Sequence, residues 1–352
     1  MPFSSSVVGC LFFCFNKSAN TAFGSAKSIL KRNAWLSGAC LAKCWLRWKA
    51  RPIKTVRDFQ WLVRPYVGNT IQRTTAGFTF SGVENLDPGK SYLFVSNHRD
   101  IALDPALLNF ALVTSGMDTV RIAIGNNLLT KPFASDLMRL NKCFVVNRSA
   151  TKPREKLKAA KQLSAYIHHS LCEDNANIWI AQREGRAKDS RDISNPAIIS
   201  MLALNKPKTQ DFGDYIARLN IVPVSISYEL DPCDEMKARE LTIKAAQGDY
   251  QKAEHEDVQS IARGILGQKN AVHVAFGQPF TRDLNSVEAV ANRLNEQIAS
   301  GYVLHPTNCI AYEMIHGRAP RVCVGHPAKP YVAREHKEAK AQFEARLKAC
   351  PS

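Results

Sequence analysis

The chain has 352 residues, of which 45% are hydrophobic and 22% charged, and its formal net charge at pH 7 is +16. This length excludes a small domain that depends on disulfides, and it allows one large α/β domain or two smaller ones with a real core. The excess charge lies mainly at the start, because ten lysines and arginines precede the first acidic residue, Asp58. Such a segment predicts an anionic partner, either a membrane surface or a nucleic acid.

Residues 1–57 are expected to form a basic amphipathic segment. No apolar run reaches the ~18 residues that a spanning helix needs, and residues 7–15 make a poor signal peptide because no positive charge precedes them. Residues 26–50 mix apolar and basic side chains, with three tryptophans suited to the headgroup level of a bilayer. We predict a membrane-surface or targeting role. A basic helix packed on its own domain, a transit peptide and a start codon placed too far upstream remain open.

Downstream, short apolar runs alternate with helical patterns. The expected strands are residues 78–82, 92–95, 120–125, 143–147, 177–182, 219–229 and 271–277. The expected helices are residues 105–113, 133–141, 152–171 and 285–300, the first of them beginning at Pro105. This order predicts an α/β fold with a mostly parallel sheet flanked by helices. We assign residues 58–315 to one α/β domain and residues 316–352 to a basic C-terminal tail.

The ten cysteines do not suggest a metal site or a disulfide framework. Two pairs, Cys10/Cys14 and Cys40/Cys44, have a helical spacing of four instead of the C-x2-C spacing of a zinc ribbon. We interpret all ten as reduced thiols in a cytoplasmic compartment, since a chain of this length needs no covalent staples.

Polar residues follow several expected strands, at the edge where α/β sheets place active groups. The stretch "NHRDIALDP" contains His98 with Asp100 and Asp104; "NKCFVVNR" ends at Arg148; and "REGRAKD" contains residues 184–186. A fourth stretch, "IVPVSI", is a strand with an embedded proline. In this order the four stretches resemble the lysophospholipid and glycerol-3-phosphate acyltransferase superfamily, over about residues 76–315.

The resemblance implies a reaction and a set of site residues. His98 would be the general base that takes a proton from an acceptor hydroxyl, whose oxygen then attacks an acyl thioester. An aspartate on the other ring nitrogen would fix the tautomer. Arg148 and Arg186 would bind the acceptor phosphate, with Glu184 and Gly185 completing the motif. The reaction needs no metal and no cofactor apart from acyl-CoA or acyl carrier protein as co-substrate.

The sequence departs from the family pattern at three of the motifs. In the second motif, Lys142 stands where the family usually has glycine. The third motif reads E-G-R-A-K-D where the family has E-G-T-R-S-R-D-G. In the first motif, the family's aspartate position, five residues after the histidine, is Leu103. Asp104 comes one residue late, but it keeps the Asp-Pro pair of the family, whereas Asp100 replaces a small hydroxyl residue. We favour Asp104 as the orienting carboxylate over Asp100, on the expectation that Asp104 is the N-cap of a helix that begins at Pro105.

We therefore predict a peripheral acyltransferase on the cytoplasmic face of a membrane. Its expected partners are an anionic membrane surface, acyl-CoA or acyl carrier protein, and a lysophospholipid acceptor, with lysophosphatidate giving phosphatidate. One alternative is the same fold acylating another acceptor, such as an aminoacyl lipid. The other is a basic nucleic-acid-binding protein, which we disfavour because the sequence contains no nucleic-acid-binding module.

Overall fold

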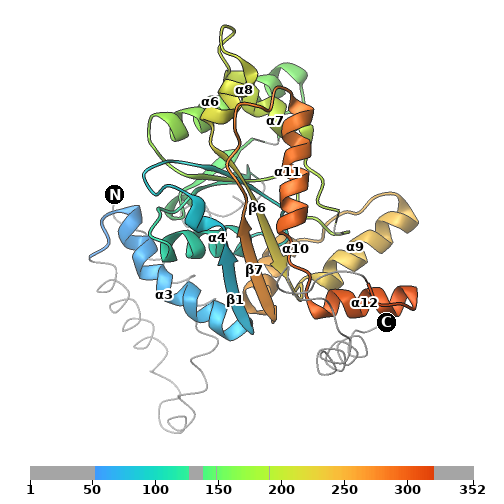
Figure 1. Cartoon of the computed structure of the whole chain (residues 1–352). Helices are drawn as coiled ribbons and strands as arrows, with labels where there is room; N and C mark the ends of the chain where they lie inside the picture. Colours follow the sequence, from blue (N-terminus) through green and yellow to red (C-terminus); the bar gives the residue numbers. More distant parts are fainter. Residues whose placement is uncertain (1–51, 127–137, 148, 190, 321–352) are drawn as a thin grey trace, which may run out of the picture. The chain divides into compact units, whose positions relative to one another are not determined.

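The computed structural model describes residues 52–126, 138–147, 149–189 and 191–320 (Figure 1). The chain falls into two compact units, Met1–Gly68 with Ile124–Ser149, and Asn69–Ala123 with Ala150–Ser352. Almost all of the predicted N-terminal segment, most of the predicted C-terminal tail and most of the helix expected at residues 133–141 lie outside the described residues, so these expectations stay predictions.

Within the described residues, seven strands form one sheet with the order β1-β7-β6-β2-β5-β3-β4. The strands are β1 (Gly77–Ser81), β2 (Leu93–Ser96), β3 (Arg121–Gly125), β4 (Cys143–Val146), β5 (Ile178–Ala181), β6 (Ile221–Tyr228) and β7 (Ala271–Phe276). The pairs β1–β7, β2–β5, β2–β6 and β3–β5 are parallel, whereas β6 and β7 are antiparallel. The predicted α/β class with a mostly parallel sheet is therefore confirmed.

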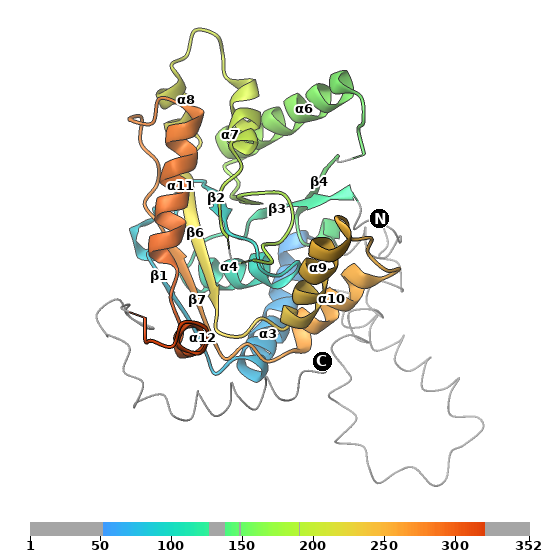
Figure 2. The same cartoon turned by 90° about the vertical axis from the view of Figure 1, so that its right-hand side faces the viewer.

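Helices flank the sheet (Figures 1 and 2). They are α3 (Val56–Thr74), α4 (Leu103–Thr114), α6 (Pro153–Cys172), α7 (Pro196–Leu202), α8 (Phe212–Arg218), α9 (Asp234–Gln247), α10 (Glu256–Leu266), α11 (Val287–Gly301) and α12 (Pro306–His316). Figure 2 shows α4 and α11 on opposite sides of the strands. All eight residues of β6 are buried, which is typical of a central strand with both faces covered.

The core explains why these short strands form. Every residue of β2 is buried, and Leu93, Phe94 and Val95 are fully inaccessible to solvent. Because a parallel strand buried on both faces needs an apolar side chain at nearly every position, β2 reads as a continuous apolar run instead of an alternating one. Edge strand β1 alternates between exposed and partly buried positions, as a strand with one covered face should.

One predicted boundary was wrong in a way that matters for the site. Helix α4 begins at Leu103 and not at Pro105, and Ala102 is its N-cap residue. Asp104 therefore lies inside the first turn and does not cap the helix. Pro105 is the third helical residue, where its missing N–H leaves one fewer donor to satisfy. Helices α3, α7, α8, α9, α10 and α12 were not predicted.

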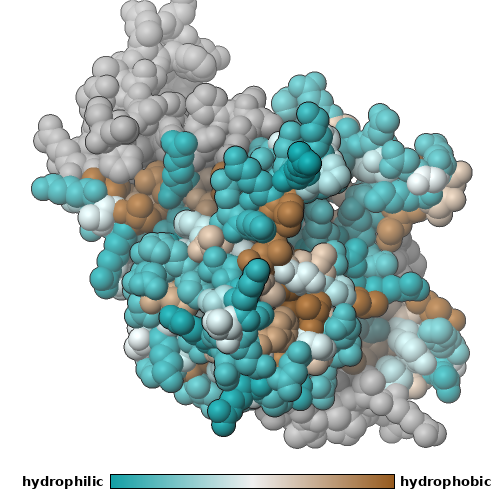
Figure 3. Space-filling view, turned by 90° about the horizontal axis from the view of Figure 1, so that it is seen from above, coloured by the Kyte–Doolittle hydropathy of each residue, from teal (hydrophilic) through white to brown (hydrophobic). Residues whose placement is uncertain are grey.

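The surface of the described residues is mainly polar, with separate apolar areas (Figure 3). Within those residues, none of the helices is long and apolar enough to cross a bilayer. The cysteines of the described ranges, Cys143, Cys172, Cys233 and Cys309, are free thiols.

Candidate active site

The end of β2 is fixed to β6 by the side chain of Asn97. Its Nδ2 donates to the carbonyl of Ile226 at 3.0 Å, and its Oδ1 accepts the N–H of the same residue at 2.8 Å. The amide thus makes with β6 the same pair of bonds that a neighbouring strand would make. Asn97 is fully buried, so both bonds are protected from water. The next residue, His98, consequently starts from a rigid backbone position at the carboxyl end of a central strand.

His98 faces Asp104. Its Nδ1 lies 2.7 Å from Asp104 Oδ2, and the exposed fractions of the two side chains are 15% and 0%. A buried carboxylate oxygen accepts hydrogen bonds, so Nδ1 carries the proton and Nε2 keeps its lone pair. The indole of Trp179 on β5 packs edge-on against the imidazole, with ring centroids 5.5 Å apart. This arrangement leaves Nε2 as the nitrogen that can accept a proton.

Asp104 is held by four donors in all. Besides His98, its Oδ2 accepts the N–H of Arg99 at 2.6 Å and the N–H of Asp100 at 3.0 Å. Its Oδ1 accepts the hydroxyl of Tyr228, at the end of β6, at 2.9 Å. Donors of this kind stabilise an ionised carboxylate in a buried position. Burial, together with the nearby Asp104 carboxylate, raises the pKa of the Tyr228 phenol well above its usual value, so this hydroxyl stays a donor.

Asp100, the rival candidate, does not contact the imidazole through its side chain. Its Oδ1 accepts the N–H groups of Ala102 at 2.9 Å and Leu103 at 2.8 Å, at the start of α4. The structure thus brings His98 together with Asp104. Burial, followed by the neighbouring Asp104 carboxylate, raises the pKa of Asp100.

The loop after β5 carries the third motif and lies against the turn of residues 98–102, which follows β2. The N–H of Ala187 donates to the carbonyl of His98 at 2.8 Å. Gly185 has a φ of 75°, a left-handed conformation that favours glycine. Arg186 is half-buried and donates from its guanidinium to Ser260 Oγ on α10 at 2.6 Å, while Glu184 is exposed. Arg148, the other predicted phosphate ligand, lies outside the described residues.

A second set of contacts ties this loop to the residue after the histidine. Arg99 forms an ion pair with Asp192, and its guanidinium lies 5.3 Å from the ring centroid of Tyr302. The carbonyl of Arg99 accepts from Lys237 Nζ at 2.8 Å. Burial raises the pKa of Asp192, and the Arg99 guanidinium opposes that shift. The turn of residues 98–102 is therefore held from both the β5 loop and α9.

Sequence reasoning missed the roles of Asn97 and Tyr228. Asn97 stands directly before the histidine in the motif itself, so its position was a usable signal. Tyr228 ends the strand that contains the embedded proline, but it is 124 residues from Asp104, and only the β2–β6 pairing brings the two together. No local pattern in the sequence indicates that contact.

The fold and the site define an α/β protein with a histidine–aspartate pair at the carboxyl edge of a mostly parallel sheet. Residues 77–227 match the protein-family model described as Acyltransferase. His98, Asp104, Arg148 and residues 184–186 all lie within the matched region.

A solved structure provides a weaker comparison. The chain is similar to the 1-acyl-sn-glycerophosphate (LPA) acyltransferase PlsC from Thermotoga maritima, with 12% sequence identity and a TM-score of 0.41. The comparison covers 85% of this chain and 96% of that one. The search of curated proteins finds no match.

Proposed function

We propose that the chain transfers a fatty acyl group from the thioester of acyl-CoA or acyl carrier protein to the hydroxyl of lysophosphatidate, giving phosphatidate and a free thiol. The observation that carries this proposal is the contact between His98 Nδ1 and the fully buried Asp104 within the acyltransferase-family region. The acceptor and donor come from the resemblance of the motifs to acyltransferases of phospholipid synthesis.

The residues perform the chemistry as follows. His98 Nε2 removes the proton of the acceptor hydroxyl as its oxygen attacks the thioester carbonyl. Asp104 stabilises the imidazolium that forms and holds the ring in place. The new C–O bond replaces the C–S bond, and the imidazolium returns its proton to the departing thiolate. General base catalysis of this kind contributes roughly 10²–10⁴ in rate.

Arg186, which would bind the acceptor phosphate, already has a protein partner. Its guanidinium donates to Ser260, and the motif around it lacks the second arginine of the family pattern. This observation favours a second candidate acceptor, an aminoacyl lipid with a free hydroxyl or amine. A guanidinium has five N–H donors, so Arg186 can still bind a phosphate while it keeps Ser260.

The test is mass spectrometry of the lipids made by the purified full chain from one acyl-CoA and an equimolar mixture of acceptors. The mixture contains lysophosphatidate, a lysophospholipid with a zwitterionic headgroup and an aminoacyl lipid, and the His98→Ala protein is the control. Phosphatidate as the dominant product supports the proposal. Dominant acylation of the aminoacyl lipid would replace the acceptor, and no acylated product from any acceptor would overturn the reaction class.

We also propose that the protein works as a peripheral protein on the cytoplasmic face of an anionic membrane, through residues 1–57. Each basic residue near such a surface contributes about 1 kcal/mol, and the segment has ten of them without an acidic residue. Vesicle flotation of the full chain and of a chain lacking residues 1–57 tests this. Equal flotation of the two proteins at low salt would rule the segment out as the anchor.

A further inference from the structure

Asp100 links the two halves of the candidate catalytic pair. Its side-chain Oδ1 accepts the N–H groups of Ala102 and Leu103 at 2.9 and 2.8 Å, which closes the turn and satisfies donors at the start of α4. Its own backbone N–H donates to Asp104 Oδ2 at 3.0 Å. Asp100 is 5% exposed, so water competes little for these bonds. One residue therefore shapes the turn and also binds the carboxylate that faces the histidine.

The spacing of the pair makes this turn necessary. Asp104 follows His98 by six residues and lies in the first turn of α4, yet its Oδ2 is 2.7 Å from His98 Nδ1. The chain must therefore leave β2, reverse within residues 99–102 and enter the helix at one fixed position. A helix start whose N–H groups have lost their side-chain acceptor frays most easily in its first turn. In this protein that turn contains Asp104.

Helix α10 supports Asp100 from the side opposite the turn. A Cβ added to Gly264 would lie 1.9 Å from Asp100 Oδ2, so only a glycine allows the helix to approach this closely. Ser260, one helical turn earlier on α10, accepts from Arg186, so the same face of α10 contacts both motifs. Gly264 and Ser260 are both buried.

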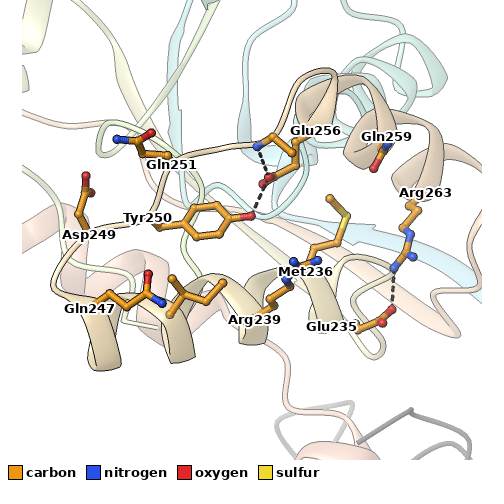
Figure 4. A pocket seen from close by; sticks show the side chains of 12 residues that line it. Glu235, Met236, Arg239, Gln247, Asp249, Tyr250, Gln251, Glu256, Gln259 and Arg263 are labelled. Carbon is orange, nitrogen blue, oxygen red and sulfur yellow. Dashed lines mark hydrogen bonds and ion pairs between the residues drawn. The ribbon is translucent and has the colours of Figure 1, made fainter.

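The outer side of α10 is fixed to neighbouring segments (Figure 4). Arg263 on α10 donates to Glu235 on α9 at 2.7 Å, and Tyr250 donates to Glu256 in the first turn of α10 at 2.7 Å. These residues line a pocket of about 600 Å³ between the two helices. These contacts hold α10 in place beside the turn of residues 98–102.

We propose that Asp100 is a positioning residue for the acyl transfer, and that the close contact of Asp100 with Gly264 holds it in place. This inference rests on the proposed function, because it gives Asp100 the task of keeping Asp104 against His98. Asp100 itself does not touch the reacting atoms. The spacing between His98 and Asp104 is one residue longer than in the family pattern. The turn that Asp100 holds compensates for this extra residue, so the two side chains still meet.

The test is steady-state kinetics of four variants of the full chain. Asp100→Ala is expected to lower kcat by about 10- to 100-fold, the size of effect that a small misplacement of catalytic groups produces, while KM for donor and acceptor stays within about twofold. Asp100→Asn and Asp100→Ser keep an oxygen that can accept the two N–H groups, and kcat is expected within about threefold of the wild-type value. Gly264→Ala is expected to lower kcat like Asp100→Ala.

The matched control is Gly77→Ala in β1, because an added Cβ there meets no atom within 4 Å. It is expected to keep the wild-type kcat. Wild-type kcat in folded Asp100→Ala, or a raised KM with unchanged kcat, would overturn the inference, as would failure of both Asn and Ser to restore kcat. If Asp100→Ala does not fold, Gly264→Ala decides in the same way. Activity in His98→Ala would instead overturn the proposed function, so the two failures are distinguishable.

Discussion

Replacing Asp104 by asparagine should remove a charge while leaving the hydrogen-bond geometry in place. Asp104 Oδ2 faces three donors, namely His98 Nδ1 and the N–H groups of Arg99 and Asp100. If the amide nitrogen of the introduced asparagine replaced Oδ2, its hydrogens would point at these three donors. The amide oxygen must therefore take the place of Oδ2. The amide nitrogen then faces the hydroxyl of Tyr228, which can rotate and accept. His98 therefore keeps its tautomer, and the negative charge beside the imidazolium is lost.

The size of the effect follows from the electrostatics. Two unit charges about 4 Å apart interact by about 4 kcal/mol at an effective dielectric constant of 20. At about 1.4 kcal/mol per tenfold in rate, losing this interaction in the transition state lowers kcat by roughly 10²–10³. Folding should change little, because all four hydrogen bonds remain possible. Asp104→Ala removes all four acceptor contacts, and the buried donors left behind should lower the free energy of unfolding by about 3 kcal/mol or more.

The assay pairs initial rates of acyl transfer with urea unfolding for wild type, Asp104→Asn and Asp104→Ala. We expect the asparagine variant to be nearly as stable as wild type and far less active, and the alanine variant to be impaired in both. Wild-type kcat in Asp104→Asn would refute the role of the charge. An asparagine variant as unstable as the alanine variant would show that its oxygen does not occupy the Oδ2 position.

Three further changes test other parts of the structure. Tyr228→Phe removes the donor to Asp104 Oδ1, so the free energy of unfolding should fall by about 1–3 kcal/mol in urea titrations. Burial lowers the pKa of Lys269 from 10.5 to about 8; the unfolded state then binds more protons above pH 8, so stability should rise between about pH 8 and 10.5, by up to ~3 kcal/mol. The Lys269→Met variant should lack this increase in stability, which urea titrations at about pH 8 and about pH 10.5 would measure. Arg186→Ala should raise KM for a phosphate-bearing acceptor more than KM for acyl-CoA, and a change in donor KM alone would assign this arginine to the donor.

Strands β2 and β6 could be predicted because each is a largely apolar run that is buried along its whole length. The run of residues 92–95 corresponds to β2, and the run of residues 219–229 contains β6. The antiparallel pairing of β6 with β7 could not be predicted in this way, since pairing depends on contacts between residues about fifty positions apart. Helices α9 and α10 were missed because the residues that they bury are not apolar. Helix α9 buries Lys237 and Glu240, and α10 buries Ser260 and Gly264.

The candidate site divides in the same way between local and distant contacts. The preference for Asp104 over Asp100 came from the Asp-Pro pair, and the structure places Asp104 against His98 although the expected cap was wrong. That error arose because a side chain within the turn, Asp100, satisfies the first N–H groups of α4, so the helix starts two residues before Pro105. The contact between Arg186 and Ser260 joins residues 74 positions apart and has no local signal.

The central claim is that His98 is the general base of an acyl transfer. Its most direct test is the initial rate of product formation, followed by mass spectrometry, for wild-type protein and for His98→Ala protein with the same urea unfolding midpoint. We expect acylated product from wild type and a rate lower by roughly 10²–10⁴ from the variant, which is the contribution of a positioned general base. Equal rates for the two folded proteins would contradict it.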